Sequence, residues 1–249
     1  MSGHSKWHTI KHKKGAADAK RGKVFTRLIK ELTVAARNGG GDPGMNPRLR
    51  TIIAAAKEVN MPADNIKKAI LRGTGELPGI IYDEITYEAY GPGGSALIIE
   101  TLTDNKNRTV GELRHMLEKH SGNLGAANSV AWMFSKKGHV VVDKAKADEE
   151  KLLSTALDAG ADDMRDDGES WEVLSDPSAF EAVRDAVKAL GIEPSSAQVA
   201  MLPQNYVTLT GKDANQMIRL MDALDDHEDV KQVWSNFDIE EKEIEASLA

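Results

Sequence analysis

One stretch predicts the C-terminal fold most directly: residues 139–201 read HVVVDKAKADEEKLLSTALDAGADDMRDDGESWEVLSDPSAFEAVRDAVKALGIEPSSAQVAM. Short apolar runs between turn residues indicate strands, and apolar residues at helical spacing indicate helices. The strands fall at Val140–Val142, Asp162–Arg165, Trp171–Leu174 and Gln198–Met201, and the helices at Asp148–Ala159 and Pro177–Leu190. This strand-helix-strand-strand-helix-strand order is typical of a ferredoxin-like domain, which we place at residues 135–202.

The segment before this domain predicts a hairpin and a helix. Ile81–Tyr90 and Ala96–Leu102 have the alternation of strands, and the glycine-rich turn Gly91–Gly94 joins them. Thr109–Glu112 has the form of a capping box, which predicts a helix that ends near His120.

A strand, a helix and a further strand are predicted after the ferredoxin-like domain, at Tyr206–Thr210, Ala214–Leu224 and Val230–Phe237. A short apolar strand, Ser129–Phe134, is expected just before that domain. The hairpin and helix need a partner to close their sheet, and the last unit supplies one. The predicted fold is therefore α+β: an N-terminal three-helix domain at 1–75, a discontinuous α+β domain at 76–134 and 203–249, and the ferredoxin-like domain inserted in it at 135–202.

Charge is distributed very unevenly along the 249 residues. Residues 1–75 contain 16 Lys and Arg against 5 Asp and Glu, whereas the remaining residues contain 16 against 34. A basic segment of this density favours binding to a polyanion, and the acidic remainder would repel one.

Three short helices with basic outer positions are predicted in this basic segment, after an extended or weakly helical arm at Ser2–Gly22. The first spans Val24–Arg37, and its cations fall largely off the apolar stripe. Asn46 is the predicted N-cap of the second, with Pro47 in its first position. The third runs from about Pro62 to Gly73.

An arm followed by three helices has the outline of a nucleic-acid-binding module. The candidate contact residues are the cations of the arm and of the helix faces, together with one tryptophan that serves either as a base-stacking platform or as a hydrophobic anchor. They are Lys6, Trp7, Lys11, Lys13, Lys14, Lys20, Arg21, Lys23, Arg27, Lys30, Arg48, Arg50, Lys67, Lys68 and Arg72. A secondary contact is expected at Lys106 and Arg108, in a polar loop predicted to lie close to the Gly91–Gly94 turn.

Signatures of catalysis are missing from the sequence. It lacks the phosphate-binding G-x-x-x-x-G-K-[ST], the dinucleotide-binding G-x-G-x-x-G and the hydrolase G-x-S-x-G motifs. The acidic pairs Asp162/Asp163, Asp166/Asp167 and Asp225/Asp226 are read as solvated carboxylates at turns and helix ends rather than as catalytic pairs. We therefore predict a protein that is not an enzyme and has no catalytic residues, cofactor or small-molecule substrate.

Metal binding is not predicted either. The chain has no cysteine, so a thiolate site is excluded. His4, His8 and His12 share helical spacing, but the interleaved lysines would repel a cation. Asp163–Gly168 resembles a calcium loop only superficially, because Arg165 occupies a ligand position.

Apolar runs are too short for a membrane span, and the basic N-terminus lacks the apolar segment of a secretory signal. We expect a cytoplasmic protein without a membrane partner.

Seven sequence motifs are distributed along the chain: GHSKW (3–7), KHKKGAADAKRGKVFTRLIKEL (11–32), GGGDP (39–43), NPRLR (46–50), YEAYGPGG (87–94), TDNKNRT (103–109) and SGNLG (121–125). These motifs closely resemble those of the YebC/PmpR family, which includes a mitochondrial translational activator of a cytochrome oxidase subunit. The likeness covers essentially the whole chain, with Ala89 where the family usually has glycine.

The resemblance implies the same three-domain fold and a non-enzymatic cytoplasmic regulator. It implies a binding surface at the motif positions Lys6, Lys11, Lys13, Lys14, Lys20, Arg21, Lys23, Arg48 and Arg50. Family members are commonly described as DNA-binding transcriptional regulators, and others act in translation. We therefore predict a DNA-binding transcriptional regulator, in which Asn65, Lys68 and Arg72 of the third helix could read bases in the major groove.

The alternative is a translation factor that binds ribosomal or messenger RNA through the basic arm, with the acidic body at the surface. The charge separation fits this alternative equally well. The acidic domains are a candidate surface for a protein partner.

Overall fold

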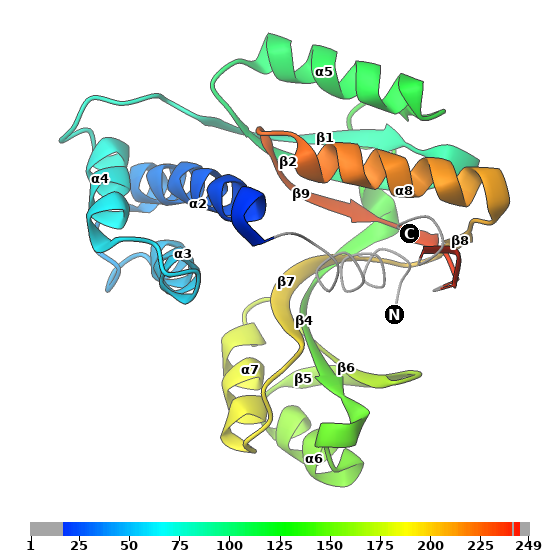
Figure 1. The fold of residues 1–249 in the computed structure, drawn as a ribbon. Helices are drawn as coiled ribbons and strands as arrows, with labels where there is room; N and C mark the ends of the chain where they lie inside the picture. The colour runs from blue at the N-terminus through cyan, green and yellow to red at the C-terminus, as the bar shows by residue number, and fades with distance from the viewer. Residues whose placement is uncertain (1–16, 241, 245–249) are drawn as a thin grey trace.

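The structure, a computed structural model, describes residues 17–240 and 242–244 (Figure 1). It begins with three packed helices: α2 (Ala17–Gly39), α3 (Pro47–Glu58) and α4 (Ala63–Thr74). Their apolar faces form one core around Leu32, Leu49 and Ala69. Two α+β parts follow, so the predicted fold class is confirmed.

Helix α2 begins earlier than the sequence pattern predicted. The arm was expected to be extended or weakly helical as far as Gly22, but the regular helix already starts at Ala17. Lys20 and Arg21 therefore belong to the backbone of α2. The stretch from 17 to 21 consists of Ala, Asp, Lys and Arg, most of which favour helix, so the helical backbone extends through it.

The start of α3 confirms the predicted cap. The side chain of Asn46 accepts a hydrogen bond from the amide of Leu49, and Pro47 occupies the first helical position. The Asn46 amide group also donates to the carbonyl oxygens of Ala35, at 2.9 Å, and Gly40, at 2.8 Å. One buried side chain thus fastens the end of α2 to the beginning of α3.

The middle part is a four-stranded sheet with strand order β3-β1-β2-β9. Helices α5 (Lys106–Lys119) and α8 (Gly211–Asp226) pack their apolar residues on one face of it (Figure 1). A short parallel pair of strands, β8 and β10, extends this part. The strands are β1 (Asp83–Tyr90), β2 (Ala96–Thr103), β3 (Asn123–Leu124), β8 (Val207–Thr208), β9 (Val230–Ser235) and β10 (Phe237–Asp238).

The third part is a four-stranded antiparallel sheet of order β5-β6-β4-β7, with two helices over a core that includes Val140, Leu152 and Val173. This order and alternation are those of a ferredoxin-like domain. Its elements are β4 (Phe134–Asp143), α6 (Glu149–Asp158), β5 (Ala161–Asp167), β6 (Ser170–Ser175), α7 (Phe180–Ala189) and β7 (Ser196–Pro203). Strands β4 and β7 reach the middle sheet (Figure 1). There Phe134 and Ala200 pack against Ile98 and Trp234.

Three local predictions were wrong. The apolar run before β4 contains a 3-10 turn at Ala131–Met133, and the strand begins only at Phe134. The predicted strand at Tyr206–Thr210 is reduced to the two residues of β8. Helix α5 is capped by Asn105 and not by Thr109, because the Thr109 hydroxyl is buried and bonds to Asp229 instead.

Candidate nucleic-acid interface

Three cations of α2 contact three aspartates that lie between α8 and β9 or at the end of α8. Lys23, Arg27 and Lys30 recur along one side of α2, and they contact Asp226, Asp225 and Asp229 in that order. Lys23 Nζ lies 2.7 Å from Asp226 Oδ1, Arg27 lies 3.7 Å from Asp225 Oδ1, and Lys30 Nζ lies 2.8 Å from Asp229 Oδ1. We call Asp225, Asp226 and Asp229 the acidic corner.

Lys30 is the deepest of the three cations. Its side chain is 10% exposed, and it also donates to the carbonyl oxygens of Leu102 and Glu228. The prediction that Lys30 lies on an outward basic face is therefore wrong. Periodicity placed it off the apolar stripe correctly, but the middle part of the chain covers that side of the helix.

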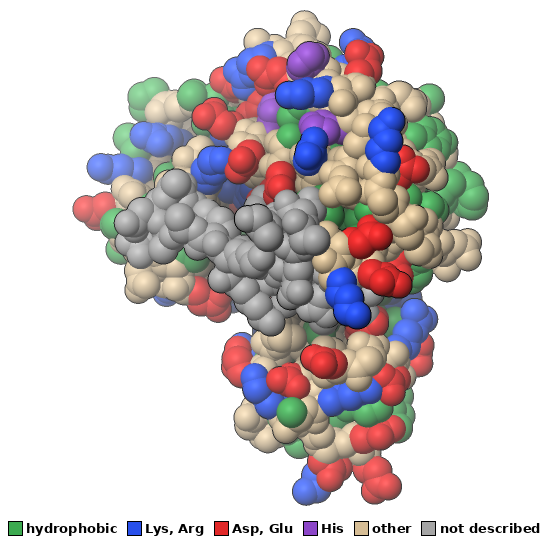
Figure 2. Space-filling model, turned by 45° about the vertical axis from the view of Figure 1, so that its right-hand side comes forward, with side chains coloured by type: hydrophobic (Ala, Val, Ile, Leu, Met, Phe, Trp, Pro, Cys, Tyr) green, Lys and Arg blue, Asp and Glu red, His purple; other side chains and the backbone are tan. Residues whose placement is uncertain are grey.

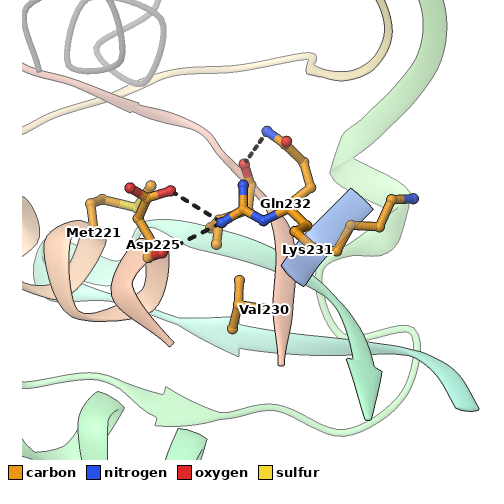
Figure 3. A pocket seen from close by; sticks show the side chains of 7 residues that line it. Met221, Asp225, Val230, Lys231 and Gln232 are labelled. Atoms are coloured by element: carbon orange, nitrogen blue, oxygen red, sulfur yellow. Dashed lines mark hydrogen bonds and ion pairs between the residues drawn. The ribbon is translucent and has the colours of Figure 1, made fainter. Parts of the chain in front are cut away.

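A small cavity of about 20 Å³ remains beside Arg27, between α8 and β9. Figure 3 shows Asp225 and Met221 on its helical side and Val230 to Gln232 on the strand side. A space of this size holds about one water molecule, so it is a packing gap and not a ligand site.

Asp229 lies at the centre of the corner. Its Oδ2 accepts hydrogen bonds from Arg108 at 2.7 Å, Thr109 at 2.8 Å and Thr103 at 3.1 Å. Burial alone would raise the pKa of Asp229, but the hydrogen bonds from Lys30, Arg108 and Thr109 outweigh it and hold this pKa well below its usual range. The carboxylate therefore stays charged and joins the helical domain, α5 and β9.

The predicted secondary contact is engaged within the protein and lies elsewhere than expected. Arg108 pairs with Asp229 and Asp104, and these hydrogen bonds raise its pKa. Lys106 lies 3.3 Å from Asp83. Both cations stand at the end of β2, whereas the Gly91–Gly94 turn stands at its beginning, so the expected proximity to that turn is wrong.

Arg48 makes a second contact between the helical domain and the middle sheet. Its two terminal nitrogens lie 2.9 and 2.7 Å from the carboxylate oxygens of Glu84, and the hydrogen bond to Glu84 raises the pKa of Arg48. Lys231 is placed between Glu84 and Glu100, at 3.6 and 3.1 Å. Glu31 of α2 completes this group, and burial raises its pKa.

The remaining candidate cations of the helical domain are exposed: Arg50 near the start of α3, and Lys67, Lys68 and Arg72 on α4. Arg50 donates to the carbonyl oxygen of Pro43 at 3.1 Å. Within residues 17–240 and 242–244, none of the four forms an ion pair. We call Lys67, Lys68 and Arg72 the cationic face of α4.

Several candidate residues lie outside the described residues. They are Lys6, Trp7, Lys11, Lys13 and Lys14, as well as His4, His8 and His12. For Lys20 and Arg21 the structure describes only the helical backbone.

The sequence reading missed the role of the acidic corner and of His227. Asp225 and Asp226 were expected to be solvated carboxylates, and no spacing in the sequence indicates that they pair with Arg27 and Lys23 of α2. His227 Nε2 lies 2.9 Å from Glu112, and its Nδ1 accepts the amide of Asp229 at 3.1 Å. A neutral His227 therefore carries its proton on Nε2.

This tautomer decides what the His227 group can bind. Oxygen and nitrogen atoms of Glu112, His227 and Asp229 lie within 4.8 Å of one another, beside a cavity of about 530 Å³. A metal ligand needs a free nitrogen lone pair, but Nε2 is protonated and Nδ1 is engaged. The group thus orients the loop that carries Asp229. Figure 2 shows histidine side chains near the top of one face of the molecule, interspersed with positive and negative side chains.

The fold and the charge distribution define a class of protein: a three-part α+β chain whose basic helical domain is fastened to an acidic body. The chain belongs to the TACO1/YebC family. Residues 5–76 match "TACO1/YebC protein N-terminal domain", and residues 82–237 match "TACO1/YebC second and third domain". The family is non-enzymatic, so the prediction that the chain is not an enzyme is confirmed.

Two relatives and one solved structure are similar to this chain over nearly its full length. A protein of Acidobacterium capsulatum is 62% identical over 243 residues, 98% of each chain, and one of Geobacter sulfurreducens is 58% identical over 245 residues, 98% of this chain and 99% of that one. Both are named "Probable transcriptional regulatory protein". The crystal structure of the conserved hypothetical protein Aq1575 from Aquifex aeolicus has a TM-score of 0.79 and 42% identity, covering 90% of this chain and 92% of that one.

None of the described helices has the length and apolar character required to cross a bilayer.

Proposed function

We propose that the protein is a cytoplasmic transcriptional regulator that binds duplex DNA through its helical domain. One observation carries the proposal: the cationic face of α4 is exposed and free of carboxylate partners within the described chain, whereas the α2 cations Lys23, Arg27 and Lys30 are engaged by the acidic corner. The names of the relatives support the same function.

Phosphate contact is the chemistry that these side chains offer. Lys67, Lys68 and Arg72 bring positive charge to one short helix, and Arg50 adds a further exposed cation. The acidic middle and ferredoxin-like parts would be repelled by the same polyanion, so they stay away from the duplex. Base reading would fall to Asn65, Lys68 and Arg72, because amide and guanidinium groups pair with base edges in the major groove.

The basic arm adds to this surface in our proposal. Lys6, Lys11, Lys13 and Lys14 precede the described part of α2, and arms of this composition are commonly ordered by the nucleic acid that they contact. Lys20, Arg21 and Trp7 belong to the same proposed surface. Lys23, Arg27 and Arg48 contribute only where a phosphate replaces their present carboxylate partner, and Lys30 is too deeply buried to do so.

A salt titration tests the α4 face. Binding of a fluorescein-labelled duplex is followed by anisotropy for the wild type, for Lys67→Ala/Lys68→Ala, and for the control Lys151→Ala/Lys212→Ala, which removes two exposed lysines elsewhere. Each lost phosphate contact lowers the slope of log affinity against log salt by about 0.9. We expect this loss only in the α4 variant. An unchanged slope would remove α4 from the interface, and Lys11→Ala/Lys13→Ala/Lys14→Ala tests the arm in the same way.

The second candidate function is binding to RNA on the ribosome, favoured by the separation of a basic N-terminal third from an acidic body. Sedimentation with ribosomes at several salt concentrations, with excess duplex DNA as competitor, distinguishes the two. If the duplex strips the protein from ribosomes and one promoter fragment binds better than random sequence, the transcriptional function holds. Retention on a ribosomal subunit despite the DNA would assign the protein to translation.

A further inference from the structure

Two aromatic side chains are unusually exposed where the middle and ferredoxin-like parts meet. Trp132 is 65% exposed and Tyr206 is 52% exposed. Every other Trp, Tyr and Phe within residues 22–240 is buried or half-buried. Large rings left in water are unfavourable, and exposed Trp and Tyr commonly serve as contact anchors.

Hydrogen bonds bring the two segments together. The amide of Gln204 donates to the carbonyl oxygen of Met133 at 2.9 Å, and its side chain donates to the carbonyl oxygen of Trp132 at 3.4 Å. Phe134 and Pro203 are paired at the adjoining end of β4 and β7. Since Tyr206 follows Gln204 by two residues, both rings come from one corner of the structure.

The loop below Trp132 is held firmly. The carboxylate of Glu88 accepts three backbone hydrogen bonds, from the amides of Asn128, Val130 and Ala131, at 2.6 to 2.7 Å. The indole nitrogen of Trp132 donates to the carbonyl oxygen of Ser129 at 3.1 Å. The ring is thus positioned before any ligand arrives, which lowers the entropy cost of binding.

The two segments contain no acidic residue of their own, and the nearby Glu88 carboxylate is engaged by three backbone amides. No acidic residue occurs between Glu118 and Asp143 or between Glu193 and Asp213, although the chain beyond residue 75 contains 34 of them. Lys136, four residues after Trp132, is exposed, as are the uncharged side chains of Asn128, Gln204 and Asn205. Charged residues of other elements, Glu172, Arg165 and Asp238, act on Tyr206. Lys136 is the charged residue nearest to Trp132 in the sequence, so a phosphate is placed at the Trp132 end. The surface can therefore approach a polyanion where most of the acidic body cannot.

We propose that Trp132 and Tyr206 form a stacking site for unpaired bases of single-stranded nucleic acid, with Lys136 beside the phosphate. Aromatic rings stack on any base, and neighbouring amides hydrogen-bond to base edges. Paired bases are hidden inside the duplex, so the ligand is an unpaired strand and not the duplex bound by α4. The inference rests on the proposed function only in taking the ligand to be nucleic acid.

Anisotropy with two probes tests the site: labelled oligouridylate RNA and oligothymidylate DNA, each of about 12 nucleotides, a length that spans a typical single-strand site. The variants are Trp132→Ala and Tyr206→Ala in the full chain, the conservative Trp132→Phe, and the control Leu157→Ala, which removes an exposed apolar side chain from α6. Thermal unfolding of each variant checks that it is folded.

We expect Trp132→Ala to weaken single-strand binding on the order of 10-fold, with an unchanged salt slope, because stacking releases no counterions. Trp132→Phe should restore most of the affinity, and Leu157→Ala should behave as the wild type. The difference between the two probes identifies the preferred sugar.

Wild-type affinity in Trp132→Ala, or no single-strand binding by the wild type, would overturn the inference. If Lys67→Ala/Lys68→Ala loses duplex binding while Trp132→Ala keeps wild-type single-strand binding, the proposed function stands and this site is refuted. If Trp132→Ala loses single-strand binding while Lys67→Ala/Lys68→Ala keeps wild-type duplex binding, the stacking site is supported and the α4 interface is refuted.

Discussion

The Nζ atom of Lys30 lies 2.8 Å from Oδ1 of Asp229, and the two residues are 199 positions apart in the sequence. This buried ion pair joins the helical domain to the middle sheet. Arg108 and Thr109 approach the other oxygen of the same carboxylate. Asp229 thus links the helical domain to the middle sheet and to the start of α5, in addition to the contact between Arg48 and Glu84.

Removing either partner of this pair should destabilise the protein strongly. We expect Lys30→Ala and Asp229→Asn each to lower the free energy of unfolding by about 3 kcal/mol, because the remaining partner stays buried without its counter-charge. Urea unfolding measures both, and the double variant should cost less than the sum of the two. The control Lys23→Ala removes an exposed pair and should cost less than about 1 kcal/mol. An equal loss of unfolding free energy in Lys23→Ala and Lys30→Ala would contradict the view that the buried pair stabilises the protein more than the exposed one.

The contribution of Asp229 should depend on pH. Its folded-state pKa lies below the value of about 3.9 expected in the unfolded chain. Its stabilising contribution is therefore complete above about pH 4 and is lost as the pH falls further through the folded-state pKa. The difference in unfolding free energy between the wild type and Asp229→Asn should shrink below about pH 4. A difference that stays constant down to about pH 3 would mean that the carboxylate charge is not responsible.

Replacing two glycines by alanine should change the stability of the protein in opposite directions. A Cβ atom at Gly73 of α4 would clash with the carbonyl oxygen of Thr33 and lie 2.8 Å from Cβ of Ala36, so Gly73→Ala should destabilise by about 1 to 3 kcal/mol. At Gly22 of α2 a Cβ atom would meet nothing within 4 Å, and alanine should stabilise the helix by about 0.5 to 1 kcal/mol. Thermal unfolding of both variants decides whether α2 and α4 touch as closely as described.

The cap residue Asn46 should contribute more to the free energy of unfolding than an ordinary helix cap. Asn46→Ala removes the bond to the Leu49 amide and leaves two carbonyl groups without their donor, so we expect a loss of about 2 kcal/mol. Asn105→Ala removes an exposed cap with a single bond and should cost about 1 kcal/mol. Chemical denaturation compares the two, and an equal loss would show that the additional bonds of Asn46 contribute nothing.

Neutralising the two exposed or half-exposed carboxylates of the acidic corner, Asp225 and Asp226, should strengthen nucleic-acid binding. In Asp225→Asn/Asp226→Asn the cations Lys23 and Arg27 lose their carboxylate partners and become available to phosphates, so duplex affinity should rise several-fold at low salt. Glu149→Gln/Glu150→Gln changes the net charge equally on an exposed turn of α6 and serves as the control. The same gain in both variants would assign the effect to net charge alone.

Much of the fold follows from residue spacing over short distances. Asn46 with Pro47 marks the start of α3, and the order of apolar runs in residues 139–201 predicts the ferredoxin-like part, because caps and periodicity act within a few residues. The same local rules fail at Thr109. Its spacing to Glu112 is that of a capping box, but a buried carboxylate far along the chain takes its hydroxyl and Asn105 becomes the cap.

Only part of the candidate site can be predicted from the sequence. Sequence alone identifies a basic N-terminal third and the outward positions of its helices, including Lys67, Lys68 and Arg72. It cannot distinguish these from Lys23, Arg27 and Lys30, because all six occupy the polar side of an amphipathic helix. That distinction depends on which carboxylates the fold brings near, and the partners Asp225, Asp226 and Asp229 lie about 200 residues away. Ion pairing depends on distance in space, which only the folded chain establishes.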